Sequence, residues 1–360
     1  MESNAFISNK EREVISTEDI EEYKKYKESH KEFKIIGTHS GTFHSDEVLS
    51  TLLLKFYPET TKSIVIRTRN NEILKQCDVV VDVGGIIDPK IYRFDHHMKE
   101  FTEVFNEKDE DLNSIKLSSA GLVWKYLGKD ILINILKSMN LLEQNKIHIE
   151  EILKNIYLDF IMGVDGMDNG VTQYDKDIKP KYKLSGNYVD RISRLNPEWN
   201  AENVDVNDRF RKGWDVAEEE LLFQIKKYAN SYFIAYDIVD NSIKDALKEN
   251  RVYFILDKFC PWKKCFYEIE KKLGIENKFL YCVHPGNNNR WCSTAINLND
   301  HCMELRKPFP KDWRAKRDEE LQKITGIKDA EFVHVSGFIS FFHLKESAIK
   351  ATEISINHKD

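Results

Sequence analysis

Histidines and carboxylates gather at four places in the first half of the sequence. These are the run GTHSGTFHSDE at 37–47, Asp82 in the run CDVVVDVGG, the step Asp95-His96-His97, and the run GVDGMDNG at 163–170. Imidazole and carboxylate together suit Mn²⁺, Fe²⁺, Co²⁺ or Zn²⁺, and a carboxylate-rich set suits a pair of such ions or Mg²⁺. Two ions about 3.5–4 Å apart can share a carboxylate and hold both oxygens of a phosphoryl displacement. The clusters therefore indicate metal-dependent phosphoryl hydrolysis.

Each cluster also has an ordinary structural interpretation when it is taken alone. Polar residues such as His39 to Asp46 often cap the helix that follows a strand. An aspartate such as Asp82 at the end of an apolar strand is commonly a turn residue, and Asp165 and Asp168 beside glycines fit an Asx turn. The four clusters together favour chemistry over four unrelated turns.

The elements around these clusters alternate between strand and helix patterns. Strands are predicted over 33–38, 63–68, 78–83 and 92–96, and helices over 46–56, 118–139 and 148–164. This order predicts an α/β fold with a mainly parallel sheet flanked by helices. Three of the clusters follow predicted strands, and open sheets of this kind place their ligands at the carboxyl ends of the strands.

The second half of the sequence predicts a smaller α/β domain after a connection. Residues 175–208 contain DKDIKPKYK and Asn196-Pro197 and resemble a linker, and a long helical stretch follows over 208–248. Strands are then expected at 252–256, 279–284, 291–298 and 331–335, with helices near 316–324 and 344–356. The expected division is a flexible charged lead-in at 1–33, a first domain at 34–175, a linker and helical connection at 176–250, and a second domain at 251–360.

Composition narrows the class of protein. The 360 residues carry 54 Lys and Arg against 60 Asp and Glu, and a net charge of −6 argues against a protein that mainly coats nucleic acid. No run of 18 apolar residues occurs, so no membrane span is expected. None of the six cysteines forms a Cys-x-x-Cys pair, and the N-terminus lacks a secretory or mitochondrial signal pattern. The cytoplasm, with nuclear access left open, is the expected location.

The order of the clusters resembles a known superfamily. His39-x4-His44-x-Asp46, Asp82, Asp95-His96-His97 and Asp165 follow the order of motifs in the DHH phosphoesterase superfamily. The longer runs GTHSGTFHSDEVLSTLLL, DVVVDVGG, YRFDHHM, LSSAGLVWKYLG and MGVDGMDNG resemble one branch, the melanocyte proliferating gene product family of 3′ to 5′ RNA exonucleases. The resemblance extends from about residue 34 to 352 and implies a DHH-type catalytic domain at 34–175.

The resemblance implies a centre of two divalent metal ions, with Mn²⁺ favoured and Mg²⁺ or Co²⁺ as alternatives. It implies six metal ligands, with Asp82 shared by both ions: His39, His44, Asp46, Asp82, His96 and Asp165. His44 departs from most of the superfamily, which has an aspartate there, and a neutral imidazole favours a transition metal over Mg²⁺. His97 is expected to contact the phosphate or protonate the leaving group, and Asp95 to orient a histidine through its N–H.

The resemblance also implies that residues 251–360 bind substrate. Arg290, His334 and Gly337 are the expected substrate contacts, the last two within HVSGF. A solvated loop arginine and a satisfied core histidine are the alternatives for Arg290 and His334. A Gly-Gly pair that often follows this run is replaced by Ser340-Phe341, and two side chains would hinder a close approach of the backbone to a phosphate.

The expected reaction is hydrolysis of a phosphodiester by metal-bound hydroxide. The resemblance implies removal of nucleotides from the 3′ end of single-stranded RNA, with this RNA or short oligonucleotides as the partner. One alternative is a hydrolase of small phosphates such as pyrophosphate, cyclic dinucleotides or very short oligonucleotides. Another is a non-catalytic RNA-binding protein that keeps the metal site for stability. The oligomeric state stays open, a dimer included.

Overall fold

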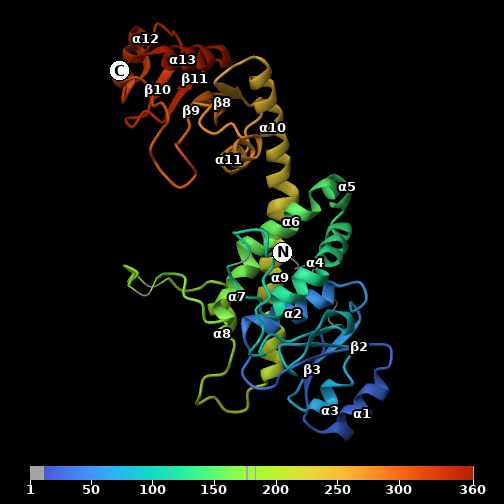
Figure 1. The fold of residues 1–360 in the computed structure, drawn as a ribbon. Helices are drawn as coiled ribbons and strands as arrows, with labels where there is room; N and C mark the ends of the chain where they lie inside the picture. The colour runs from blue at the N-terminus through green and yellow to red at the C-terminus, as the bar shows by residue number, and fades with distance from the viewer. Residues whose placement is uncertain (1–11, 113, 176, 183, 360) are drawn as a thin grey trace. The chain divides into compact units, whose positions relative to one another are not determined.

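A computed structural model describes residues 12–112, 114–175, 177–182 and 184–359. The chain divides into two compact units, Met1–Ala229 and Asn230–Asp360. Each unit combines helices with a sheet of its own (Figure 1), which confirms the α/β class. No helix among the described residues is long and apolar enough to cross a membrane.

The sheet of unit 1 has six strands in the order β1-β3-β2-β4-β6-β5. Neighbouring strands run parallel except for β5 and β6, so the mainly parallel sheet is confirmed. The strands are β1 (Val14–Ser16), β2 (Lys34–Thr38), β3 (Ser63–Arg67), β4 (Val79–Val81), β5 (Ile87–Asp88) and β6 (Arg93–Phe94). All residues of β3 and β4 are buried, as expected of central strands covered on both faces.

In unit 1, the first α-helices alternate with strands, and the later ones follow the last strand. They are α1 (Ile20–Ser29), α2 (Ser45–Phe56), α3 (Asn71–Leu74), α4 (Ser119–Ser138), α5 (Leu142–Asn145), α6 (Ile149–Ile156), α7 (Met162–Asp168), α8 (Tyr188–Ser193) and α9 (Val206–Lys227). Short 3₁₀ turns are η2 (Pro89–Ile91) and η3 (Lys146–His148), and π-helical η4 (Tyr157–Ile161) joins α6 to α7. Every residue of α2 is buried, because α4 and α9 both pack against it. The first turn of α2 therefore lies in the interior.

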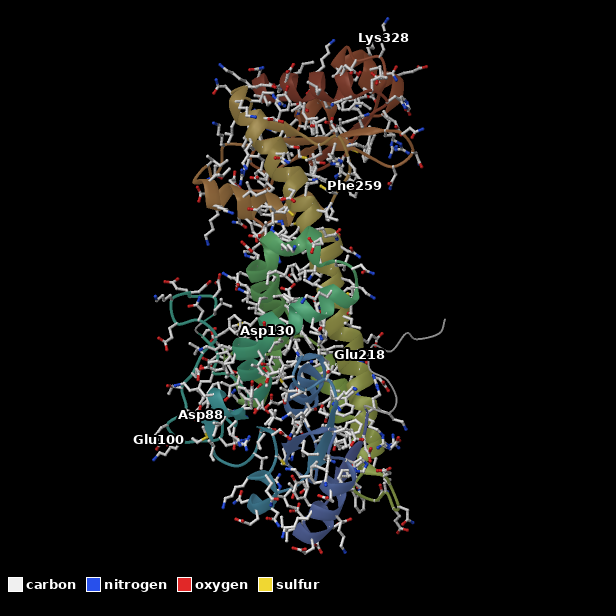
Figure 2. The ribbon with its side chains drawn as sticks, turned by 90° about the vertical axis from the view of Figure 1, so that its right-hand side faces the viewer. Asp88, Glu100, Asp130, Glu218, Phe259 and Lys328 are labelled. Atoms are coloured by element: carbon white, nitrogen blue, oxygen red, sulfur yellow. The ribbon has the colours of Figure 1, made fainter. Side chains whose placement is uncertain are left out.

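The structure corrects the expectation of a flexible lead-in at 1–33 for the residues it describes. β1 pairs with β3, with Val14 opposite Val65, and Tyr23 of α1 is fully buried. Arg12 forms ion pairs with Asp215 and Glu218. Both acids belong to α9, on which Figure 2 marks Glu218. A three-residue strand is too short to show an alternating pattern, so the sequence gives no local sign of it. Residues 1–11 lie outside the described residues.

The long helical stretch predicted at 208–248 is present, with a π-helical turn inside it. α9 continues into η5 (Tyr228–Tyr232) and then α10 (Phe233–Lys248), and the two units divide within η5. The described part of 176–208 belongs to unit 1. Tyr188 donates a hydrogen bond to the Ser45 carbonyl, 3.2 Å away, and the Asn196 side chain bonds both backbone polar groups of Phe43. These contacts hold the segment against the loop before α2 and against the first turn of α2.

Unit 2 is built on a five-stranded sheet in the order β10-β11-β9-β8-β7. β7 and β8 run parallel, and the other neighbours run antiparallel. The strands are β7 (Tyr253–Ile255), β8 (Tyr281–Pro285), β9 (Trp291–Ala295), β10 (Ala330–Val333) and β11 (Ile339–Phe342), and the further helices are α11 (Trp262–Leu273), η6 (Lys311–Trp313), α12 (Asp318–Thr325) and α13 (Lys345–Asn357). β11 is absent from the predicted strands. Its partners at 291–295 and 330–333 are both predicted.

Candidate metal centre

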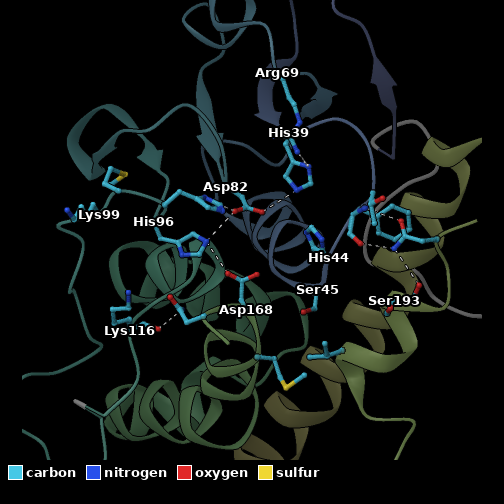
Figure 3. Close-up of a pocket in the computed structure, with 18 residues that line it drawn as sticks. His39, His44, Ser45, Arg69, Asp82, His96, Lys99, Lys116, Asp168 and Ser193 are labelled. Carbon is cyan, nitrogen blue, oxygen red and sulfur yellow. Dashed lines mark hydrogen bonds and ion pairs between the residues drawn. The ribbon is translucent and has the colours of Figure 1, made fainter. Parts of the chain in front are cut away.

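The predicted histidines and aspartates meet at one edge of the unit 1 sheet. β2, β4 and β6 are neighbours in the sheet, and His39, Asp82 and the Asp95-His96-His97 step directly follow them. Because parallel strands end at the same edge, three segments far apart in sequence come together there. The first turn of α2 brings Asp46 and Glu47 to the same edge. Figure 3 shows the pocket that His39, Asp82 and His96 line there.

Asp82 lies between two histidines at the middle of this pocket. Its Oδ2 is 3.4 Å from His39 Nε2, and its Oδ1 is 3.3 Å from His96 Nε2 (Figure 3). Asp82 has a φ of 57°, a left-handed conformation that aspartate tolerates better than most residues. Burial raises the pKa of Asp82, but hydrogen bonds from the two histidines outweigh it and lower the pKa to about 2. The carboxylate is therefore ionised and faces two neighbouring groups.

The first group of potential ligands consists of His39, His44, Glu47 and Asp82, whose ligand atoms lie within 4.8 Å of one another. His39 Nε2 is 3.0 Å from Glu47 Oε1, and His39 Nδ1 is 3.1 Å from the Ser40 carbonyl oxygen. A proton on Nδ1, held by that carbonyl, would leave the Nε2 lone pair facing the carboxylates. This is the tautomer that a metal ligand requires.

Glu47 is a member of this group that the sequence analysis did not assign. It is fully buried, and its Oε1 also accepts a hydrogen bond from the His44 backbone N–H at 2.8 Å. In the sequence it stands three residues after His44 at the start of a predicted helix. A glutamate at this position is typically a capping residue. Its position next to the predicted ligands in the run HSDE was the sequence feature that could have identified it as a further ligand.

The second group surrounds His96. His96 Nε2 lies 3.1 Å from Asp168 Oδ2 and 3.7 Å from Asp46 Oδ2. These three side chains form one set of potential ligands, and Asp82, His96 and His97 form another. Asp82 belongs to sets on both sides, so the two groups adjoin at its carboxylate.

Asp165 was expected to be a ligand of this group, but the structure brings Asp168 there instead. The Asp165 Oδ1 accepts hydrogen bonds from the N–H and hydroxyl of Ser118, at 2.9 and 2.7 Å, and Oδ2 accepts one from Tyr157 at 2.9 Å. A Cβ atom at Gly121 would collide with this carboxylate. Asp165 thus lies against the start of α4, and Asp168 lies one helical turn further along.

Asp46 also contacts the start of α4. Its Oδ1 accepts a hydrogen bond from the Ala120 N–H, and its Oδ2 accepts one from the Ser119 N–H at 2.9 Å. Asp46 Oδ1 also lies 2.7 Å from Ser118 Oγ, whose single proton can bond only one of Asp46 and Asp165 at a time. Carboxylates are stabilised at a helix N-terminus by its unpaired N–H groups and dipole. This accounts for the run LSSAG in the sequence: it forms the helix start that holds Asp46 and Asp165.

His97 and Asp95 form a pair at the rim of the pocket. The His97 side chain is 63% exposed, and its Nδ1 lies 2.7 Å from Asp95 Oδ1. Asp95 is buried and also accepts hydrogen bonds from the backbone N–H groups of His97 and Gly85. Asp95 therefore fixes the orientation of His97 and directs Nε2 away from the carboxylate.

The buried charges raise the histidine pKa values strongly. Burial lowers the pKa of His39, but Asp82 and Glu47 outweigh it and raise the pKa to about 10. For His96, burial is likewise outweighed by Asp168 and Asp82, which raise the pKa to about 11. The pKa of Asp46 lies well above its ordinary value because of burial and repulsion by Asp82 and Asp168. In the protein without ions, protons balance the acidic pocket, and cations would displace them.

Three ligand atoms of these groups are buried and lack a well-aligned hydrogen bond, although the last two lie 3.3 Å apart: Glu47 Oε2, Asp82 Oδ1 and His96 Nε2. An unpaired buried polar group costs about 1–3 kcal/mol, and more when it is charged. Carboxylate oxygens and an imidazole nitrogen are the donor atoms that first-row divalent metals prefer. The residues present therefore fit divalent metal ions on both sides of Asp82.

The three substrate contacts expected in the second half have partners within unit 2. Arg290 lies 2.9 Å from Glu331 and over the Phe341 ring, and His334 Nδ1 lies 2.9 Å from Ser336 Oγ. Gly337 has a φ of 74°, and its carbonyl accepts a hydrogen bond from the Phe309 N–H, so glycine is required for a tight turn. Ser340 is fully buried in β11. Each of these residues has a partner within unit 2, and a role in substrate binding stays a prediction.

A family model matches residues 35–356 of the chain; it is named MYG1_exonuc and described as uncharacterised protein family UPF0160. The MYG1 protein of Dictyostelium discoideum is 36% identical over 87% of this chain and 94% of that protein. The MYG1 exonuclease of Mus musculus is 33% identical over 89% of this chain and 84% of its own. Among solved structures, CDC45 of Entamoeba histolytica aligns over 94% of this chain and 98% of its own with 10% identity and a TM-score of 0.24, which supports no conclusion.

Proposed function

Because the chain belongs to the MYG1 exonuclease family, we propose that it is a metal-dependent phosphodiester hydrolase that removes nucleotides from the 3′ end of single-stranded RNA. The name of the mouse relative supports nuclease activity. The 3′ to 5′ direction and the RNA substrate rest on the sequence resemblance. The cytoplasm, with access to the nucleus, is the proposed location.

The two-sided environment of Asp82 is the observation that supports this proposal most strongly. Its oxygens lie 3.4 Å from His39 and 3.3 Å from His96, and each histidine belongs to a different group of ligand-type atoms. A carboxylate shared by two ions is the arrangement of two-metal phosphoryl transfer sites. Bound divalent ions would supply positive charge for the phosphate and lower the pKa of water.

We assign the metal-holding residues from the geometry. One ion would be held by His39, His44, Glu47 and Asp82, and the other by Asp46, Asp82, His96 and Asp168. This assignment adds Glu47 and replaces Asp165 with Asp168, because Asp168 lies 3.1 Å from His96 and shares a group of potential ligands with Asp46 and His96, whereas Asp165 belongs to no such group among the described residues. Imidazole and carboxylate together favour Mn²⁺ over Mg²⁺.

His97 is the proposed proton donor to the leaving oxygen. Its Nδ1–H donates to Asp95, and the Nε2 atom is then free for the substrate. Asp95 acts as a positioning residue that selects this tautomer, as carboxylates do for other catalytic histidines. We further propose that residues 251–360 contribute substrate binding, although Arg290 and His334 already have partners in that unit.

Degradation of single-stranded RNA labelled at the 3′ or 5′ end tests the proposed function. With Mn²⁺, label at the 3′ end should be released at once as mononucleotide, while 5′-labelled RNA should shorten stepwise. EDTA and the double variant Asp95→Ala/His96→Ala should both abolish this. Intact RNA together with hydrolysis of pyrophosphate or cyclic dinucleotides would favour the small-phosphate alternative. RNA that binds but survives, with no hydrolysis of small phosphates, would indicate a binding protein.

A further inference from the structure

The side chain of Arg67, the last residue of β3, is buried without a counter-charge. The residue is 1% exposed, and no carboxylate among the described residues forms an ion pair with it. Its guanidinium donates a hydrogen bond to the Gly41 carbonyl and lies 5.6 and 5.0 Å from the ring centroids of Phe43 and Phe210. The two rings offset part of the cost of burial, but a buried charge without an opposite charge still costs several kcal/mol.

A second buried arginine of the chain shows the usual way in which this cost is met. The Arg306 side chain is 4% exposed, and its two terminal nitrogens donate to the two oxygens of Glu270, each at 2.6 Å. For Arg67, burial lowers the pKa, and the charge of Glu47 offsets this only in part and without an ion pair. Arg67 therefore lacks the anion that Arg306 has.

Arg67 lines a cavity of about 530 Å³ that also contains hydrogen-bond donors. Ser16, Thr42 and Asn207 contribute polar side chains to the same cavity. The Asn207 Oδ1 accepts a hydrogen bond from Ser16 Oγ at 2.8 Å, which leaves the amide NH₂ to donate. Neither this NH₂ group nor the Thr42 hydroxyl has a partner among the residues that the structure describes. The cavity thus combines a buried cation with two available donors.

One carboxylate lines the cavity, and its charge is compensated elsewhere. Asp205 is the N-cap of α9, and its Oδ1 accepts hydrogen bonds from the backbone N–H groups of Asn207 and Asp208, at 2.9 and 3.0 Å. Its Oδ2 lies 3.7 Å from Arg211. A carboxylate at a helix N-terminus is stabilised by these N–H groups and by the helix dipole. Asp205 therefore does not replace the missing partner of Arg67.

The cavity wall also has an apolar part. Pro197, Val204 and Val206 line it together with the polar side chains. Inorganic phosphate would use only the polar part. A nucleoside monophosphate would use both, with its phosphate at Arg67 and its ribose and base against the apolar side chains.

We propose that this cavity is an anion site that binds a phosphate group through Arg67, Thr42 and Asn207. The apolar wall favours a nucleoside monophosphate over inorganic phosphate. Thr42 also lines the metal pocket, and the loop that contains it begins at His39 and ends at His44. A bound anion would therefore contact the loop that carries two proposed metal ligands. The inference goes beyond the proposed function and does not depend on it, because it requires neither metal nor turnover.

Equilibrium binding to the full chain in EDTA tests this inference, with inorganic phosphate and adenosine 5′-monophosphate as the two probes. Arg67→Met removes the charge and keeps a side chain against the two rings. Asn207→Asp adds a negative charge to the cavity but keeps the acceptor for Ser16, and an acid in the first turn of a helix favours folding. The matched control is Asn71→Asp, which adds the same charge to the exposed first turn of α3, outside both cavities.

Both cavity variants should bind the probes more weakly by about ten-fold or more, since a hydrogen bond to a charged group is lost or a like charge is added. The control should match the unmodified protein. Tighter binding of adenosine 5′-monophosphate than of phosphate would support the nucleoside monophosphate, and equal affinities would support the phosphate group alone. If Arg67→Met does not fold, Asn207→Asp decides.

Two results would overturn the inference. One is the absence of binding to the unmodified protein. The other is unchanged binding in Asn207→Asp, and loss of binding in Lys99→Gln/Lys116→Gln would then place the anion in the metal pocket, which these lysines line. RNA hydrolysis is not part of the measurement, so failure of the proposed function would leave this inference standing.

Discussion

The candidate functional residues of the two units differ in their hydrogen-bond partners. In unit 1, Glu47, Asp82 and His96 are buried within groups of potential metal ligands, and each has a ligand atom that lacks a well-aligned hydrogen bond. In unit 2, Arg290 has Glu331 and His334 has Ser336 as partners. Buried polar atoms are almost always paired, so convergent unpaired ligand atoms need an explanation that paired ones do not. This difference supports the proposal that the metal centre lies in unit 1.

Removal of Asp82, the proposed shared ligand, is expected to lower activity more than any other single change. Asp82→Ala should lower kcat/KM by about 10³-fold, because the charge that the metals supply is worth several kcal/mol. Elemental analysis should show a loss of metal from the same variant. Two metals per chain in Asp82→Ala would refute its role as a bridge.

Removal of His97 should affect turnover without affecting metal content. His97→Ala should reduce kcat by about 10²-fold, the lower end of what a general acid contributes. Kinetics and elemental analysis on one preparation would separate the two properties. A loss of one metal would instead make His97 a ligand, which its position beside Asp82 and His96 permits.

Asp168 and Asp165 offer a matched pair within one helix. Asp168→Asn should weaken metal binding by more than about 100-fold, the upper end of what losing a residue that only orients a ligand costs, whereas Asp165→Asn should retain both metals. Asparagine at 165 still accepts from Ser118 and can donate to Tyr157, so that variant keeps the local hydrogen bonds. Titration with Mn²⁺ measures both affinities, and the reverse order would restore Asp165 as the ligand.

Asp165 should also make stability depend on pH. Burial raises its pKa to about 7, so between about pH 4 and 7 the folded state keeps a proton that the unfolded state has released. Stability should therefore fall as pH rises through this window, by on the order of 4 kcal/mol. Urea unfolding in EDTA should show this fall in the unmodified protein and a smaller one in Asp165→Asn. Parallel curves would contradict the assignment.

A substitution in unit 2 should have the smallest effect on stability and activity. Arg290→Ala removes a partly exposed ion pair and a contact with the Phe341 ring, so it should cost about 1 kcal/mol of unfolding free energy. Hydrolysis of bis(p-nitrophenyl) phosphate should be unchanged. A ten-fold loss of RNA affinity with no loss of stability would show that Arg290 binds substrate after all.

The parts of the fold that the sequence predicted are those with a local pattern. Central strands such as Ser63–Arg67 and helices such as Ser119–Ser138 carry continuous apolar runs or helical spacing. β1 and β11 were missed for different reasons. β1 has three residues in a charged segment and is defined by its pairing with β3. β11 directly follows the Gly337 turn, where the run HVSGF drew attention to a ligand rather than a strand.

The sequence identified where the site lies but not every residue that completes it. His39, Asp82 and His96 follow strands, and the parallel order brings strand ends together. Asp165 and Asp168 are one helical turn apart, so sequence spacing cannot decide which carboxylate reaches His96. That choice depends on the start of α4, whose Ser118 holds Asp165 through a contact 47 positions away in the chain. Glu47 was not predicted as a ligand because its position at the start of a helix is also that of an ordinary capping residue.

The proposed mechanism requires two metal ions, one on each side of Asp82. Anomalous diffraction from crystals grown with Mn²⁺ would locate them. Two peaks about 3.5–4 Å apart are expected, one next to His39 and Glu47 and the other next to His96 and Asp168. A single peak, or a second peak ligated by Asp165 in place of Asp168, would contradict it.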